Sequence, residues 1–194
     1  MQKATPPGTG AMAALLGAEI DLAQEICAAA ATNPETGKKE VVEAANDNGG
    51  GQVVISGAKA AVERAIEIAK EKGVKRAMLL PVSAPFHCAL MAPAADAMAE
   101  ALGKASMKAP VVPVVANVTA AKATDPAEIR DLLVRQVTGT VRWRECVGFM
   151  AAQGVTRFYE IGAGKVLTGL SKKNAPDATA FARRMAAVMV KALG

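Results

Sequence analysis

The chain has 194 residues, of which 52% are apolar but only 3% are aromatic, so its core must be built from Ala, Val, Leu, Ile and Met. This length allows one domain of ordinary size or two small ones. The net charge of +5 would suit an acidic or phosphorylated partner, but the basic residues are scattered and stacking aromatics are few, which argues against nucleic-acid binding.

The first part of the chain shows the hydrophobic spacing of alternating strands and helices. Strands are predicted at 10–17, 41–46, 52–57 and 76–82, and helices at 18–31 and 58–73. The order β, α, β, β, α, β is typical of a ferredoxin-like α+β domain, a four-stranded antiparallel sheet with two helices on one face. We therefore predict a ferredoxin-like small subdomain over residues 1–82.

The second part, residues 83–194, alternates in the manner of α/β layers. The pattern predicts helices at 89–103, 126–137, 141–154 and 178–194, and strands at 111–118 and 156–162. Two strands are fewer than the roughly five of an ordinary sheet. The pattern therefore indicates an incomplete α/β sheet after residue 82.

Cysteine usage and hydropathy bear on location. The cysteines, Cys27, Cys88 and Cys146, are odd in number and far apart, which argues against a disulfide framework and against a zinc site. The early apolar run 11–17 is too short to cross a bilayer, and no secretory signal pattern is present. We expect a cytoplasmic protein with no membrane association.

Two common chemical motifs can be excluded. The glycine-rich stretch 161-IGAGKVLTG-169 has Val166 after its lysine and lacks the early glycine of a phosphate-binding P-loop. No serine has the flanking glycines of a G-x-S-x-G nucleophile elbow. By motif alone, the chain has no nucleophile.

The only histidine, His87, stands in the segment 81-PVSAPFHCALM-91, just ahead of a predicted helix. Taken alone, it fits either a structural histidine at a helix start or a general base. The segment around it resembles the histidine motif of bacterial malonyl-CoA:acyl carrier protein transacylases. Further stretches resemble the same family in order and spacing: 9-TGAMAALLG-17, 52-QVVISGAKAAVERA-65, 110-PVVPVVANV-118, 129-IRDLLVRQ-136, 150-MAAQGV-155 and 159-YEIGAGKVLTGL-170.

This resemblance implies a ferredoxin-like subdomain followed by the C-terminal part of an α/β-hydrolase-like acyltransferase subdomain. It also implies ping-pong transfer of a malonyl group from malonyl-CoA to the phosphopantetheine thiol of acyl carrier protein through an acyl-serine. His87 matches the general base, and Gln136 matches the residue whose main-chain carbonyl orients the imidazole. The partners implied are malonyl-CoA and acyl carrier protein, with no metal and no cofactor.

The resemblance also implies a set of residues around the acyl group. Phe86 matches a position where a bulky aromatic ring accompanies malonyl and a smaller residue accompanies methylmalonyl, so we expect malonyl preference. Asn46, Asn48, Met12 and Leu90 match residues that line the acyl cleft, although 49-GG-50 replaces the Ser-Pro common after the second asparagine.

In the family, the oxyanion loop, the nucleophile elbow and the arginine that holds the malonyl carboxylate lie upstream of the matched region. We therefore expect the chain to correspond to the C-terminal two thirds of the enzyme and to be inactive by itself. An alternative of another class is a non-catalytic truncated remnant that binds acyl carrier protein or a CoA thioester. A free-standing ferredoxin-like binding domain is a third alternative, but it does not explain the resemblance of residues 159–170.

Overall fold

The computed structural model describes residues 4–183 of this mixed α/β protein. The chain divides into two compact units, Met1–Trp143 and Arg144–Gly194. This division falls well after the subdomain boundary expected near residue 82. The expected boundary stays a prediction.

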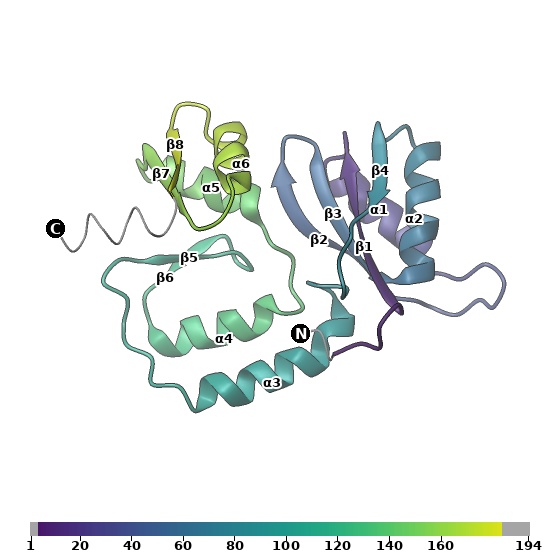
Figure 1. The fold of residues 1–194 in the computed structure, drawn as a ribbon, viewed down its shortest axis with the longest axis horizontal. Coiled ribbons are helices and arrows are strands. Elements are labelled where there is room, and N and C mark those ends of the chain that lie inside the picture. The colour runs from purple at the N-terminus through teal and green to yellow at the C-terminus, as the bar shows by residue number, and fades with distance from the viewer. Residues whose placement is uncertain (1–3, 184–194) are drawn as a thin grey trace. The chain divides into compact units, whose positions relative to one another are not determined.

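The first unit is built on a four-stranded antiparallel sheet in the order β2-β3-β1-β4 (Figure 1). Its strands are β1 (Gly10–Leu16), β2 (Val42–Gly49), β3 (Gln52–Ala58) and β4 (Arg76–Leu79). Helix α1 (Ile20–Ala30) joins β1 to β2, and helix α2 (Lys59–Glu71) joins β3 to β4. Each of these elements overlaps the range that hydrophobic spacing predicts for it.

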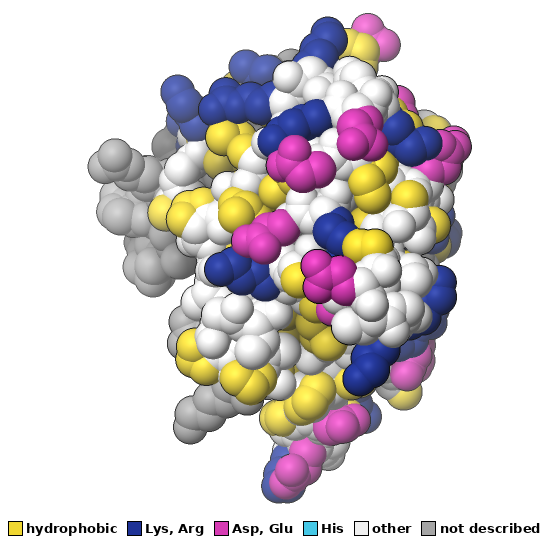
Figure 2. All heavy atoms as spheres, turned by 90° about the vertical axis from the view of Figure 1, so that its right-hand side faces the viewer, with side chains coloured by type: hydrophobic (Ala, Val, Ile, Leu, Met, Phe, Trp, Pro, Cys, Tyr) yellow, Lys and Arg dark blue, Asp and Glu magenta, His cyan; other side chains and the backbone are white. Residues whose placement is uncertain are grey.

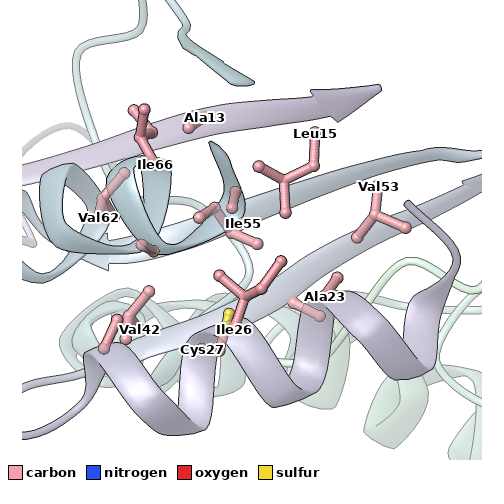
Figure 3. Packing of buried hydrophobic residues seen from close by; sticks show 14 of the residues in the cluster. Ala13, Leu15, Ala23, Ile26, Cys27, Val42, Val53, Ile55, Val62 and Ile66 are labelled. Atoms are coloured by element: carbon pink, nitrogen blue, oxygen red, sulfur yellow. The ribbon is translucent and has the colours of Figure 1, made fainter. Parts of the chain in front are cut away.

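The alternation of side chains along the strands separates two faces of this sheet. One face, carrying Leu15 and Ile55, packs against the helices through Ile26 of α1 and Val62 of α2 (Figure 3). All four of these side chains are fully buried. Their burial anchors both helices to the same side of the sheet and leaves the other face to receive later parts of the chain.

That other face carries a smaller apolar cluster made of Met12, Ala45 and Val54, against which Leu80 and Phe86 pack. The chain therefore crosses this face after β4 and brings the predicted histidine segment against it.

The remainder of the first unit contains the short 3-10 turn η1 (Ala89–Met91), helices α3 (Ala92–Gly103) and α4 (Pro126–Gln136), and a small hairpin. Asp125 caps α4 by accepting a hydrogen bond from the backbone N–H of Glu128 at 2.8 Å. The hairpin consists of β5 (Val114–Ala116) and β6 (Ala121–Ala123).

The strand predicted over 111–118 is too long, because only Val114–Ala116 pairs. Pro113 lacks an N–H to donate to a ladder, and Val111 before it is fully exposed. The pairing strand β6 is not predicted, since 121-AKA-123 has only three residues, too few for a strand pattern to be recognised.

The second unit contains most of α5 (Trp143–Ala152), followed by β7 (Arg157–Ile161), α6 (Val166–Asn174) and β8 (Thr179–Arg183). Strands β7 and β8 pair in parallel, and the rings of Tyr159 and Phe181 stack with their centroids 5.1 Å apart. The helix predicted over 178–194 is wrong for 179–183, because that segment forms β8 with Ala180 buried. The remainder of that predicted helix, 184–194, lies outside the described residues.

Figure 2 shows the face of the first unit on the side of α2. Acidic side chains lie among basic ones over most of this face, so the positive net charge forms no single-sign surface there. Within residues 4–183, no helix is both long enough and apolar enough to cross a bilayer.

Candidate functional site

The site is organised around the turn that contains His87. The histidine has a left-handed backbone with φ of 59°, a conformation that is uncommon for any residue other than glycine. Directly after it, the thiol of Cys88 donates back to the carbonyl of Pro85 at 3.2 Å, and the N–H of Ala89 donates to the carboxylate of Glu43 at 3.0 Å. The first bond closes the turn around His87, and the second ties the start of η1 to β2.

The ring of His87 is half-buried, and its Nδ1 lies 2.9 Å from the main-chain carbonyl oxygen of Gln136. Gln136 is the last residue of α4, where helical carbonyls have no partner in the next turn. Because a carbonyl can only accept, the neutral ring carries its proton on Nδ1 in this pair. Its Nε2 then presents a lone pair that can take up a proton.

The carbonyl of Gln136 is itself held in place by the loop that follows α4. The side-chain Nε2 of Gln136 donates to the carbonyl of Gly139 at 2.8 Å. Two residues further on, the hydroxyl of Thr140 donates to the carbonyl of Ala44 at 2.7 Å, and the N–H of Val141 donates to that of Ala45 at 2.8 Å. The loop after α4 is thereby bonded along the outer edge of β2.

Three of the predicted acyl-cleft residues lie on the open face of the sheet. Met12 and Phe86 belong to the same apolar cluster. Asn46 stands opposite Val54 of that cluster in the strand register, and directly opposed residues of antiparallel strands share a face. The structure therefore brings these residues to the side of the sheet on which His87 sits.

The other two predicted acyl-cleft residues, Leu90 and Asn48, lie outside this apolar cluster. Leu90 is half-buried within η1, just after the histidine turn, and is not a member of the Met12 cluster. Asn48 lies near the end of β2, within a second irregularity in its pairing with β3, between Asp47 and Gly49.

Sequence reasoning missed Glu43, Thr140 and Cys88. Burial raises the pKa of the Cys88 thiol, which keeps it protonated and able to donate to Pro85. Cys88 lies inside the histidine segment and could have been singled out. Glu43 and Thr140 bond to residues 46 and 96 positions away, and no local pattern signals such contacts.

The described residues, 4–183, hold no group of three or more His, Cys, Asp or Glu side chains arranged to bind a metal ion. The imidazole of His87, oriented by the carbonyl of Gln136, offers proton transfer at its Nε2.

Comparisons with known proteins identify relatives of this chain. No protein-family model matches the chain. The chain is 49% identical over 193 residues to the malonyl CoA-acyl carrier protein transacylases of Salmonella typhimurium and Escherichia coli K12, covering 100% of this chain and 60% of each relative. The relative from Bacillus subtilis is 45% identical over 173 residues, which is 89% of this chain and 53% of that protein.

Solved structures lead to the same relatives. The acyl-carrier-protein-S-malonyltransferase of Bartonella henselae superposes with a TM-score of 0.89 at 50% identity, covering 99% of this chain and 59% of that one. A type II PKS acyl-carrier protein in complex with its malonyl-transacylase also matches, with a TM-score of 0.89, 43% identity, and coverage of 99% and 60%.

These matches first define the class: the relatives are transferases that work with an acyl carrier protein. More narrowly, the chain belongs to the malonyl CoA-acyl carrier protein transacylase family, which confirms the resemblance drawn from its motifs. The chain spans about 60% of the length of the curated relatives it matches.

Proposed function

We propose that this chain is part of an enzyme that transfers a malonyl group from malonyl-CoA to the phosphopantetheine thiol of an acyl carrier protein. The observation that carries the proposal is the 2.9 Å contact between His87 Nδ1 and the carbonyl of Gln136, in a chain that is 49% identical to transacylases. This contact leaves Nε2 as the base that acyl transfer needs.

Two subdomains belong to the proposal. Residues 1–82 form the ferredoxin-like small subdomain, supported by the sheet order β2-β3-β1-β4 with α1 and α2 on one face. Residues 83–194 form the C-terminal part of an α/β-hydrolase-like acyltransferase subdomain.

In the proposed mechanism, a serine outside this chain attacks the malonyl thioester while Nε2 of His87 takes its hydroxyl proton. The histidine then gives that proton to the departing thiolate of CoA, leaving malonyl-serine. In the second half, Nε2 takes the proton of the phosphopantetheine thiol, the thiolate attacks the malonyl ester, and the histidine returns the proton to the departing serine oxygen. The carbonyl of Gln136 holds the ring in one tautomer throughout.

This proposal is tested with a chimera, because the chain alone is expected to transfer no malonyl group. Residues 1–194 replace the homologous part of the Escherichia coli transacylase, and transfer from malonyl-CoA to holo acyl carrier protein is measured. The chimera should be active, and His87→Ala should lower its kcat/KM by roughly 10²- to 10⁴-fold. Gln136→Ala should cost less than about tenfold, since it keeps the carbonyl and removes only the bond to Gly139.

The control is Gln153→Ala, an exposed position at the end of α5. A chimera whose activity survives His87→Ala would contradict the assigned base. A folded but inactive chimera, together with binding of acyl carrier protein by the 194-residue chain, would favour the alternative of a non-catalytic remnant.

Phe86 is proposed to set the acyl preference, with Met12, Asn46, Asn48 and Leu90 lining the rest of the cleft. The ring of Phe86 packs against two apolar clusters, that of Met12 and that of Met91, so its position is fixed from both sides. In the chimera, Phe86→Ala should raise the ratio of kcat/KM for methylmalonyl-CoA over malonyl-CoA by about tenfold, the effect of one methyl group in an apolar pocket. An unchanged ratio would remove Phe86 from this role.

A further inference from the structure

The hydrogen bond between His87 and Gln136 joins two segments that are 49 residues apart in the chain. One partner is a side chain on a left-handed turn, and the other is a carbonyl at a helix end. The turn of His87 and the end of α4 belong to different segments, so the hydrogen bond would lengthen if either segment moved by itself. Something shared must therefore set the 2.9 Å separation.

The edge strand β2 contacts the histidine segment through Glu43. Its carboxylate accepts from the N–H of Ala89, two residues after His87. In the strand register Glu43 stands opposite Ser56, and Ser56 stands opposite Met12, so this row crosses three strands on the open face. The tether thus begins on the same surface against which Phe86 packs.

The same strand contacts the segment of Gln136 through the next residues along. The hydroxyl of Thr140 donates to the carbonyl of Ala44, and the backbone of Val141 bonds to Ala45 and Asp47 at 2.8 and 2.9 Å. Glu43 and Ala44 are consecutive, so the two tethers start from adjacent residues of one strand. Glu43 and Ala44 are paired with Ser56 and Ile55 of β3, so the sheet fixes the positions from which both tethers start.

We propose that Glu43 and Thr140 are positioning residues that use β2 as a common scaffold to hold the His87 ring against the carbonyl of Gln136. The effect of these residues on catalysis rests on the proposed function, but the orientation of the His87 ring can be measured without it.

The test uses the fact that His87 is the only histidine, so its ring nitrogens give unambiguous signals in the full chain. The ratio of the Nδ1–H to the Nε2–H tautomer is measured by ¹⁵N NMR at a pH where the ring is neutral. Glu43→Ala and Thr140→Val should each lower this ratio by about three- to tenfold, the net worth of one hydrogen bond to the carbonyl. The tautomer ratio of the double variant should fall no further than that of the more affected single variant, because both tethers act on the same hydrogen bond.

Glu43→Gln keeps an oxygen that can accept from Ala89 and should hold the ratio within about twofold. Glu67→Ala is the matched control, since Glu67 is exposed and its ion pair is with Lys70 in the same helix. An unchanged ratio in Thr140→Val, an unchanged ratio in Glu43→Ala, or a loss in Glu43→Gln as large as in Glu43→Ala would overturn the proposal. Failure of the chimera to transfer malonyl would overturn the proposed function while leaving these NMR outcomes intact.

Discussion

At the scale of single residues, the backbone of His87 is the least ordinary feature of the site. Among the described residues, only His87 and Ala120 have a left-handed backbone without being glycine, with φ of 59° and 53°. This conformation brings Cβ close to the following carbonyl and costs roughly 1–2 kcal/mol, which glycine avoids. His87 keeps this strained backbone in the folded chain, and strained backbones of this kind cluster at functional sites.

This strain predicts an unusual order of stability for two variants that both lose the ring. His87→Gly should be more stable than His87→Ala by up to about 1 kcal/mol, because relief of the left-handed cost exceeds the extra freedom of glycine in the unfolded chain. Urea unfolding followed by the fluorescence of Trp143, the single tryptophan, measures the difference.

The comparison needs a pair of controls. Ala120→Gly should be more stable than the parent, because Ala120 also has a left-handed backbone. Ala97→Gly, on the exposed face of α3, should destabilise the fold by about 1 kcal/mol. If His87→Gly were the less stable of the two variants, the left-handed turn would not be a source of strain.

The sequence predicts the contact between His87 and Gln136, but it gives no sign of the residues that hold the two in place. His87 and Gln136 are identifiable because they lie in motifs, and the contact expected between ring and carbonyl is present at 2.9 Å. The left-handed turn and the hydrogen bond from the N–H of Ala89 to the carboxylate of Glu43 are products of tertiary packing. A carboxylate on an edge strand looks like any exposed polar residue until the chain that it contacts is folded against it.

At the scale of elements, one arginine links helices α1 and α2 to the segment that leads into β2. Arg64 of α2 donates to the carbonyl of Ala30, at the end of α1, and to the carboxylate of Glu40. The hydrogen bond from Arg64 is the main cause that lowers the pKa of Glu40 below its ordinary value of 4.5, and a bond from Asn33 acts in the same direction. The pair therefore fixes the loop that leads into the strand carrying both tethers.

The lowered pKa predicts a pH-dependent contribution to stability. A carboxyl group whose pKa is lower in the folded state stabilises the fold above the unfolded-state pKa and loses that contribution as the pH falls through the folded-state pKa. Glu40→Gln should thus lower the free energy of unfolding at neutral pH, and its difference from the parent should shrink below pH 4.5. Urea unfolding across pH 3 to 7 measures this.

The exposed pair between Lys59 and Glu63, at 3.9 Å, supplies the control. Glu63→Gln should change stability little at any pH, as exposed ion pairs contribute little. A difference between Glu40→Gln and the parent that stays constant with pH would show that the carboxylate charge is not what stabilises this loop.

The helices and strands of residues 9–82 follow from hydrophobic periodicity because each has a long buried stripe or an alternating face. The short strands β6 and β8 could not be found this way. Strand β6 has only three residues, too few for a pattern to be recognised. The segment 179-TAFAR-183 has the alanine and arginine content of a helix but is held extended by parallel pairing with β7. Tertiary pairing overrode local preference at both places.

At the scale of the whole molecule, the second unit leaves apolar side chains uncovered. Within residues 144–183, β7 and β8 pair with each other and with no third strand. Tyr159 and Ile161 alternate along β7 and are 52% and 55% exposed, although parallel strands are normally covered on both faces. Val166 and Leu167 at the start of α6 are exposed as well.

Uncovered apolar strands of this kind predict that the chain associates with itself in solution. The weight-average mass measured by sedimentation velocity should rise with protein concentration. Ile161→Lys should reduce that rise, because it places a charge on the exposed apolar face of β7. Gln153→Lys adds the same charge at an exposed polar position of this unit and should leave association nearly unchanged. If both lysine variants reduced association equally, net charge and not the face of β7 would control it.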